Sequence, residues 1–200
     1  MSVSIVRKLL KGMTGSNYME RLKKAVVAGL VLLMGLVSLS ACGRANSPQS
    51  SRGPLNVKKI TYLVYCGGLP DVYLYIFTSD LKVKKYSIKP EGDKTYDYLA
   101  GELPSKDLYE ITEFKISDMD WSSIVNVLTR VDFMALDEDT STKELIDDGS
   151  SYYIKVETSD SVNVSGGYVA GYDDNAESRR FVQAKEMIEN AIKAGNLKDD

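Results

Sequence analysis

The chain has 200 residues, 44% of them apolar, and a formal net charge of −3 at pH 7. This length and composition are typical of one globular domain with additional segments. The sequence contains no histidine. Its absence excludes Ser-His-Asp and Cys-His catalysis and removes the commonest metal ligand.

Charge is unevenly distributed along the chain. Residues 1–41 hold six of the 25 basic residues and one of the 28 acidic residues, which leaves 19 basic and 27 acidic residues, a net charge of about −8, from Cys42 onward. We expect no nucleic-acid partner for this acidic part, because affinity for phosphates depends on basic side chains. The same charge repels anionic surfaces and favours solubility.

Residues 19–43 contain a basic, an apolar and a small-residue segment, in that order, followed by a cysteine. Arg21, Lys23 and Lys24 form a basic start, and Ala25–Val37 is an apolar run of 13 residues. A secretory signal has an apolar run of about 7–15 residues, whereas a membrane-spanning helix needs roughly 20. The residues that follow are Leu39, Ser40, Ala41 and Cys42. Together these features resemble the signal peptide and lipobox of bacterial lipoprotein precursors.

The resemblance implies cleavage between Ala41 and Cys42 and attachment of a diacylglyceryl group to the Cys42 thiol. Two acyl chains anchor stably, whereas one holds only marginally, since each buried CH₂ contributes about 0.8 kcal/mol. We therefore expect a signal peptide over residues 1–41 and a mature protein anchored by its lipid on the extracytoplasmic face of the cell membrane. Two questions stay open. Either translation starts at Met19 or Met13, or residues 1–18 extend the basic start as a long, tolerated n-region. Separately, the alternative to lipidation is a signal-anchor helix in which Cys42 is incidental.

A tether and a single domain are expected next. Residues 42–56 are rich in Gly, Ser, Pro and Asn, which predicts a flexible tether with a random-coil reach of about 20 Å. Residues 57–200 then form the domain, and about 145 residues can bury a core without a metal or a disulfide. Lipidation of Cys42 would leave Cys66 without an intramolecular cysteine partner.

The first half of the domain predicts an antiparallel meander. Turn signals at 67–71 and 79–80 and an irregular loop at 90–104 separate four strands, expected at Lys58–Cys66, Val72–Phe77, Leu81–Ile88 and Tyr109–Ile116. Alternation predicts that one sheet face, covered by helices, carries Ile60, Tyr62, Val64, Val72, Leu74 and Ile76. The opposite face would then carry Tyr65, Tyr73, Tyr75 and Phe77.

The second half predicts a helix, a strand hairpin and a second helix. Ser117 and Asp120 form an N-terminal capping pair before an apolar stripe of Trp121, Ile124, Val125 and Leu128. Strands at Tyr152–Val156 and Ser161–Val164 form the hairpin. The last helix is predicted to begin with the capping pair Asp174 and Glu177, to bury Phe181, Ala184, Met187, Ile188, Ala191 and Ile192, and to stop at Gly195. The order of elements indicates an α+β fold, a mainly antiparallel sheet with two helices packed on one face.

Three groups of residues are candidates for chemical sites. Acidic residues at 137–139 and 147–148 suit either Ca²⁺ or plain solvation, and no EF-hand pattern is present. Gly166–Gly171 suits either a phosphate loop or a strand end, but it lacks the phosphate-loop spacing. Cys66 is either a reactive thiol or an inert one, and its sequence neighbours favour the inert thiol. The sequence therefore predicts no metal site, no cofactor and no catalytic residue.

Tyrosine is the residue type that most favours binding. Of the 13 tyrosines, 12 follow Cys42. A tyrosine offers a flat apolar ring with a polar tip, which suits a protein or glycan partner in the cell envelope, although it is also a common strand residue. The predicted binding face consists of Tyr65, Tyr73, Tyr75 and Phe77. The function expected is a non-enzymatic, membrane-tethered binding module; the alternatives are a histidine-free hydrolase that uses paired carboxylates and a subunit that docks on another envelope protein.

We predict that the mature N-terminus is acylated Cys42 and that residues 1–41 are absent. Mass spectrometry of the N-terminal peptide from detergent-extracted protein measures both features, and a Cys42→Ser variant serves as the unlipidated control. A chain that retains Ala25–Ala41 without acylation would contradict the lipoprotein assignment.

Overall fold

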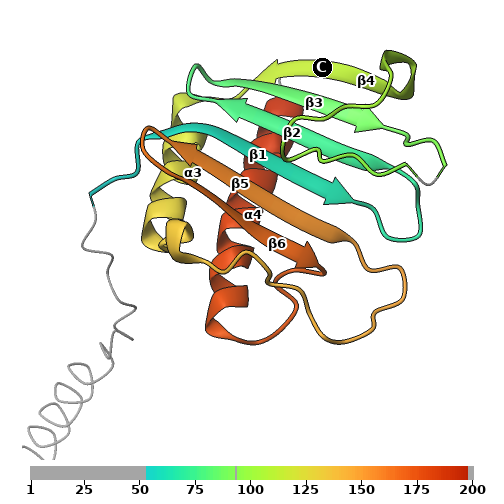
Figure 1. Cartoon of the computed structure of the whole chain (residues 1–200). Coiled ribbons are helices and arrows are strands. Elements are labelled where there is room, and N and C mark those ends of the chain that lie inside the picture. The colour runs from blue at the N-terminus through green and yellow to red at the C-terminus, as the bar shows by residue number, and fades with distance from the viewer. Residues whose placement is uncertain (1–52, 93, 198–200) are drawn as a thin grey trace, which may run out of the picture. The chain divides into compact units, whose positions relative to one another are not determined.

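The computed structural model describes residues 53–92 and 94–197. In this part of the chain, six strands form one antiparallel sheet in the order β4-β3-β2-β1-β5-β6, accompanied by two helices (Figure 1). The strands are β1 Val57–Tyr65, β2 Val72–Thr78, β3 Lys82–Ile88, β4 Tyr109–Lys115, β5 Ser151–Thr158 and β6 Val162–Tyr168. The helices are α3 Asp118–Arg130 and α4 Ala176–Asn196, and short 3₁₀ turns lie at Lys106–Leu108 and Phe133–Ala135. The α+β fold expected from the sequence is confirmed; the signal peptide, Cys42 and residues 42–52 of the tether lie outside the described residues.

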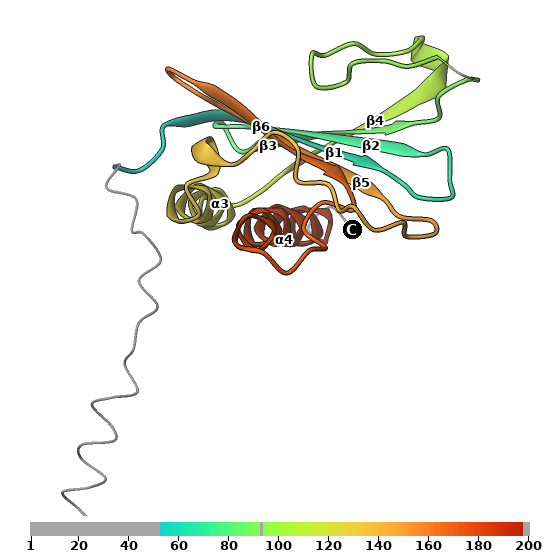
Figure 2. The same ribbon diagram turned by 60° about the horizontal axis from the view of Figure 1, so that its bottom comes forward.

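Both helices cover the same face of the sheet, as Figure 2 shows. Helix α3 begins with the predicted capping box, in which the Asp120 N–H donates to Ser117 Oγ at 3.1 Å and Asp120 Oδ2 accepts from the Ser117 N–H. The Arg180 guanidinium on α4 donates to the carbonyls of Val131 and Asp132 just after α3. It therefore satisfies carbonyl groups at the end of α3 and joins the two helices.

The ends of α4 differ from the prediction in two respects. The N-cap is Asn175 rather than Asp174, and its side chain accepts from the Ser178 N–H at 2.8 Å. At the other end, the helix continues through Gly195 to Asn196. Gly195 serves packing instead of termination, because a Cβ there would collide with the ring of Phe114 on β4.

The expected faces of β2 are reversed. Strands β1 and β2 pair so that these residues lie opposite each other: Ile60 and Phe77, Tyr62 and Tyr75, Val64 and Tyr73, Tyr65 and Val72. Directly opposed residues share a face, so Tyr73, Tyr75 and Phe77 face the helices, while Val72, Leu74 and Ile76 face away. The length of the β1–β2 connection sets this register, and a shift of one residue exchanges the faces of a whole strand. Because β2 is apolar on both faces, its alternation could not identify the helix-covered side.

The face away from the helices is covered by a segment without long regular elements. We call residues 89–92 and 94–108 the covering segment; it runs over this face between β3 and β4 (Figure 2). Its Tyr98 is 4% exposed and packs in a second apolar cluster with Leu63, Val72, Leu74 and Ile88. Lys155 Nζ on β5 donates to the Leu99 carbonyl at 2.9 Å and also joins the segment to the sheet.

The glycine-rich motif at the end of β6 has a packing role. Residues 138–142 run beside it, and the Thr140 N–H donates to the Gly166 carbonyl at 2.8 Å, while the Gly166 N–H donates to the Glu138 carbonyl at 3.0 Å. Gly167 has φ +139°, and a Cβ on it would overlap the Ser141 hydroxyl. The motif is thus a strand end, as the sequence indicated. Its glycines have no side chain, which allows the backbone of residues 138–142 to approach it closely.

We predict that Leu74→Ala lowers the free energy of unfolding by about 2–5 kcal/mol, because Leu74 is 1% exposed in the second cluster and its loss leaves a cavity. Ile111→Ala on the edge strand β4 is the control; its side chain is 50% exposed, and we expect a change below about 0.5 kcal/mol. Chemical denaturation of both variants measures the difference. Equal, small losses would mean that the covering segment does not bury this face.

Candidate functional site

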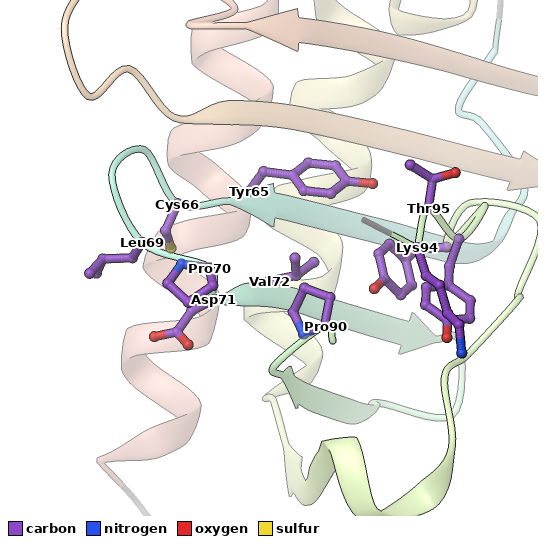
Figure 3. Close-up of a pocket in the computed structure, with 11 residues that line it drawn as sticks. Tyr65, Cys66, Leu69, Pro70, Asp71, Val72, Pro90, Lys94 and Thr95 are labelled. Atoms are coloured by element: carbon purple, nitrogen blue, oxygen red, sulfur yellow. The ribbon is translucent and has the colours of Figure 1, made fainter. Parts of the chain in front are cut away.

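A pocket of about 190 Å³ opens where the β1–β2 connection meets the covering segment (Figure 3). The residues that line it are Tyr65, Cys66, Leu69, Pro70, Asp71, Val72, Pro90, Lys94, Thr95, Tyr96 and Tyr98. The strand end and the connection supply one wall, and the covering segment supplies the other. The pocket therefore exists only because the covering segment folds back onto the sheet.

Three tyrosines define the interior of this pocket. The ring centroids of Tyr65 and Tyr98 lie 6.1 Å apart, and those of Tyr96 and Tyr98 lie 5.9 Å apart. The ring of Tyr65 also packs edge to face against that of Tyr153 on β5, with centroids 6.1 Å apart. Such spacings are within the range of favourable ring pairs. The cluster is thus a braced aromatic wall rather than a set of independent side chains.

The Tyr65 hydroxyl remains protonated at neutral pH. Burial, followed by the nearby Tyr98, Tyr153 and Asp97, raises its pKa to about 12. Burial and the neighbouring Tyr96 also raise the pKa of Tyr98. Both phenols can consequently donate hydrogen bonds, and neither serves as a base.

The charged groups of the pocket lie at its two ends. Asp71 lies near Leu69 and Pro70 of the connection, whereas Lys94 lies near Thr95 of the covering segment (Figure 3). Lys94 is exposed, and among the described residues it has no carboxylate partner. A bound group would therefore meet apolar and aromatic surface between an acidic end and a basic end.

Cys66 contributes no reactive thiol to this pocket. It is a free, half-buried cysteine, and burial together with the charge of Asp71 raises its pKa. A raised pKa keeps the thiol protonated and weakly nucleophilic at neutral pH. Its N–H donates to the Asp71 carbonyl at 3.1 Å, so Cys66 helps to close the connection.

The four residues of the predicted binding face do not lie together. Tyr65 lines the pocket, but Tyr73, Tyr75 and Phe77 face the helices. The Lys85 ammonium lies 5.3 Å from the centre of the Tyr73 ring. The Tyr75 ring stacks on that of Tyr62 with centroids 6.0 Å apart, and Phe77 is fully buried.

The pocket residues outside the strands were missed as a site. Tyr96 and Tyr98 lie in a polar stretch between 90 and 104, which the sequence identified only as an irregular loop. Two tyrosines within such a stretch are the signal that could have found them, because buried aromatic side chains anchor loops to a sheet.

Two carboxyl groups meet elsewhere, at the surface near the start of α4. Partial burial, a hydrogen bond with Asp137 and the negative charge of Asp137 together raise the pKa of Glu177, although Arg180 opposes the shift. Neither the pocket described above nor a second pocket of about 450 Å³ contains this pair. The second pocket is lined by residues 53–56, Met134 and 158–161, and Asp160 is its only acidic residue.

The acidic residues at 137–139 and 147–148 lie in loops and turns. Asp139 Oδ1 accepts from the Ser141 N–H at 2.9 Å, and hydrogen bonds from Ser141 lower the pKa of Asp139. Asp148 has φ +58°, a left-handed conformation that Asp tolerates in turns. Within the described ranges, no group of three or more Asp, Glu or Cys side chains is arranged to hold a metal ion. No described helix is long and apolar enough to span a membrane.

We predict that Glu177→Gln stabilises the protein at neutral pH. A pKa raised by folding means that the native state binds the proton more tightly than the unfolded chain, so stability from Glu177 is present below its ordinary pKa of 4.5 and is lost as the pH rises through the folded pKa. The gain in Tm should be about 1–2 °C at pH 7, the scale of a surface electrostatic interaction. It should shrink toward pH 3.

Thermal unfolding between pH 3 and pH 8 measures this dependence. Glu186→Gln provides an exposed control on the same helix. A Glu177→Gln variant less stable than the wild type at pH 7 would show that Arg180 outweighs the repulsion from Asp137.

Comparison with known proteins identifies no relative of this chain. No protein-family model matches the sequence, no curated protein matches it, and no solved structure matches it. The role of the site is therefore argued from its own chemistry: an aromatic pocket with one cation, one carboxylate and no reactive thiol.

Proposed function

We propose that this protein is a lipid-anchored, extracytoplasmic binding module without catalytic activity, and that the tyrosine-lined pocket is its binding site. Support for the anchor comes from the basic start, the apolar run and the lipobox at residues 39–42. Support for binding comes from the pocket, which combines ring surfaces with a few polar groups, as ligand sites commonly do.

The observation that carries the proposal is the composition of the pocket wall. Tyr65, Tyr96 and Tyr98 offer rings with protonated hydroxyls, and apolar side chains fill most of the remaining wall. Tyrosine at such a place supplies a large contact area with little conformational freedom to lose. The pocket is therefore suited to holding a group rather than to transforming it.

Hydrolysis by paired carboxylates has less support. Glycoside hydrolysis requires two carboxyl groups about 5–9.5 Å apart on either side of the scissile bond. The tyrosine-lined pocket has Asp71 as its only acidic side chain. Asp137 and Glu177 do meet, but they line neither of the two pockets described above.

Photo-crosslinking in living cells tests the proposal. A photoreactive benzoylphenylalanine replaces Leu69, which is 62% exposed at the edge of the pocket, or Met119, which is 76% exposed on α3. We expect a discrete adduct from position 69 and none from position 119, because only the first lies at the pocket.

Thr95→Trp supplies the matched control for that experiment. Thr95 is exposed and lines the pocket, so the indole is expected to fill it while leaving the core intact. The adduct from position 69 should then disappear. An adduct that survives Thr95→Trp, or that forms equally from position 119, would contradict the pocket as the binding site.

A further inference from the structure

We infer that the pocket receives one apolar or aromatic side chain of a partner protein, and that an acidic residue of the partner lies beside this side chain, against Lys94. This inference rests on the proposed binding function and specifies the chemistry of the partner. It is drawn from the size of the pocket, its rim and the positions of its two charges.

The size of the pocket limits the occupant to about one ring. Pockets for whole small molecules usually measure about 300–1,000 Å³. An apolar cavity of about 150 Å³ accommodates a single benzene ring. At about 190 Å³, this pocket matches the ring of one side chain.

The rim favours a protein as the source of that ring. Leu69 is 62% exposed and Pro70 is also exposed, so the apolar surface continues from the pocket onto the β1–β2 connection. Protein interfaces commonly combine a buried anchor side chain with a surrounding apolar contact. A sugar would instead need polar side chains on several sides of its ring, whereas Leu69 and Pro70 offer apolar surface on this side of the pocket.

The positions of Lys94 and Asp71 make the two ends of the pocket electrostatically different. Lys94 and Thr95 lie at one end of the pocket, and Asp71 lies at the opposite end with Leu69 (Figure 3). An acidic partner residue is attracted to the Lys94 ammonium and repelled by Asp71 and by Asp97, whose charge also acts on the Tyr65 hydroxyl. Lys94 is a cation in a part of the chain, from Cys42 onward, that carries 19 basic and 27 acidic residues.

Fluorine NMR with defined peptides tests the inference on the full chain in detergent micelles. The probe is acetyl-Gly-(4-fluoro-Phe)-Glu-Gly-amide, and the matched peptide carries Gln in place of Glu. We expect the fluorine resonance of the Glu peptide to shift on binding. Affinity should fall about two- to five-fold for the Gln peptide and for Lys94→Gln, the range of an exposed ion pair.

Two protein variants complete the test. Thr95→Trp should abolish the shift, with circular dichroism confirming its fold. Lys106→Gln should leave the shift unchanged, because Lys106 lies on the same covering segment outside the pocket wall. Equal affinity for both peptides, or a shift that survives Thr95→Trp, would overturn the inference.

The peptide and crosslinking results together distinguish failure of this inference from failure of the proposed binding function. If the peptides fail to bind while the crosslink from position 69 still depends on an open pocket, the partner chemistry is wrong and the binding function stands. If N-acetylglucosamine binds in a Thr95-dependent manner and the peptides do not, the occupant is a sugar, and the inference is likewise overturned.

Discussion

The burial of strand β1 on both of its faces is the constraint on which the rest of the domain depends. Ile60 and Tyr62 lie against the helices, while Leu63 lies under the covering segment, and all are at most 2% exposed. A central strand with two apolar faces needs a cover on each side, because leaving either face in water would forfeit about 25 cal/mol for every Å² of apolar surface. Two helices supply one cover. The segment between β3 and β4 supplies the other, and it does so with tyrosine, leucine and proline side chains rather than with a third helix.

The two covers are attached by different kinds of contact. Helix α4 buries a continuous stripe of apolar side chains, and polar contacts of Glu189 and Lys185 join the helix to the sheet. There the Tyr62 hydroxyl donates to Glu189 Oε1 at 2.7 Å, Lys185 pairs with Glu189 at 3.0 Å, and the Lys185 ammonium lies 4.3 Å from the centre of the Tyr152 ring. The covering segment is joined to the sheet by the hydrogen bond from Lys155 to the Leu99 carbonyl and by the contact of the Tyr98 ring with Tyr65 at the end of β1. A pocket remains where this irregular segment and the β1–β2 connection fail to close on each other. The candidate site is therefore a consequence of how the second face is covered.

This origin also explains the chemistry of the site. Strand residues contribute Tyr65 and Val72, whose positions the sheet holds rigidly, while Lys94, Thr95 and Tyr96 come from the segment that lies over it. A rigid apolar floor with polar groups from a loop is a common arrangement for recognition, because loops carry functional side chains while a scaffold positions them. The Cys66 thiol and the Tyr65 phenol both have raised pKa values, so neither acts as a nucleophile or a base at neutral pH. These groups are consistent with the proposed binding role.

Local sequence patterns determined the elements of this protein and their order. The four strands of the first half, the capping box at Ser117 and Asp120, the apolar stripe of α4 and the strand end at Gly166 all follow from alternation, helical spacing or glycine, which act within a few residues. The predicted placement of β2 failed because Val72, Leu74 and Ile76 are as apolar as Tyr73, Tyr75 and Phe77. Only the register with β1, a contact between strands, decides which set meets the helices. The pocket likewise joins residues 65–72 to residues 90–98 across the sheet. No periodicity within either segment encodes that meeting, which depends on tertiary packing of the covering segment against a second apolar face.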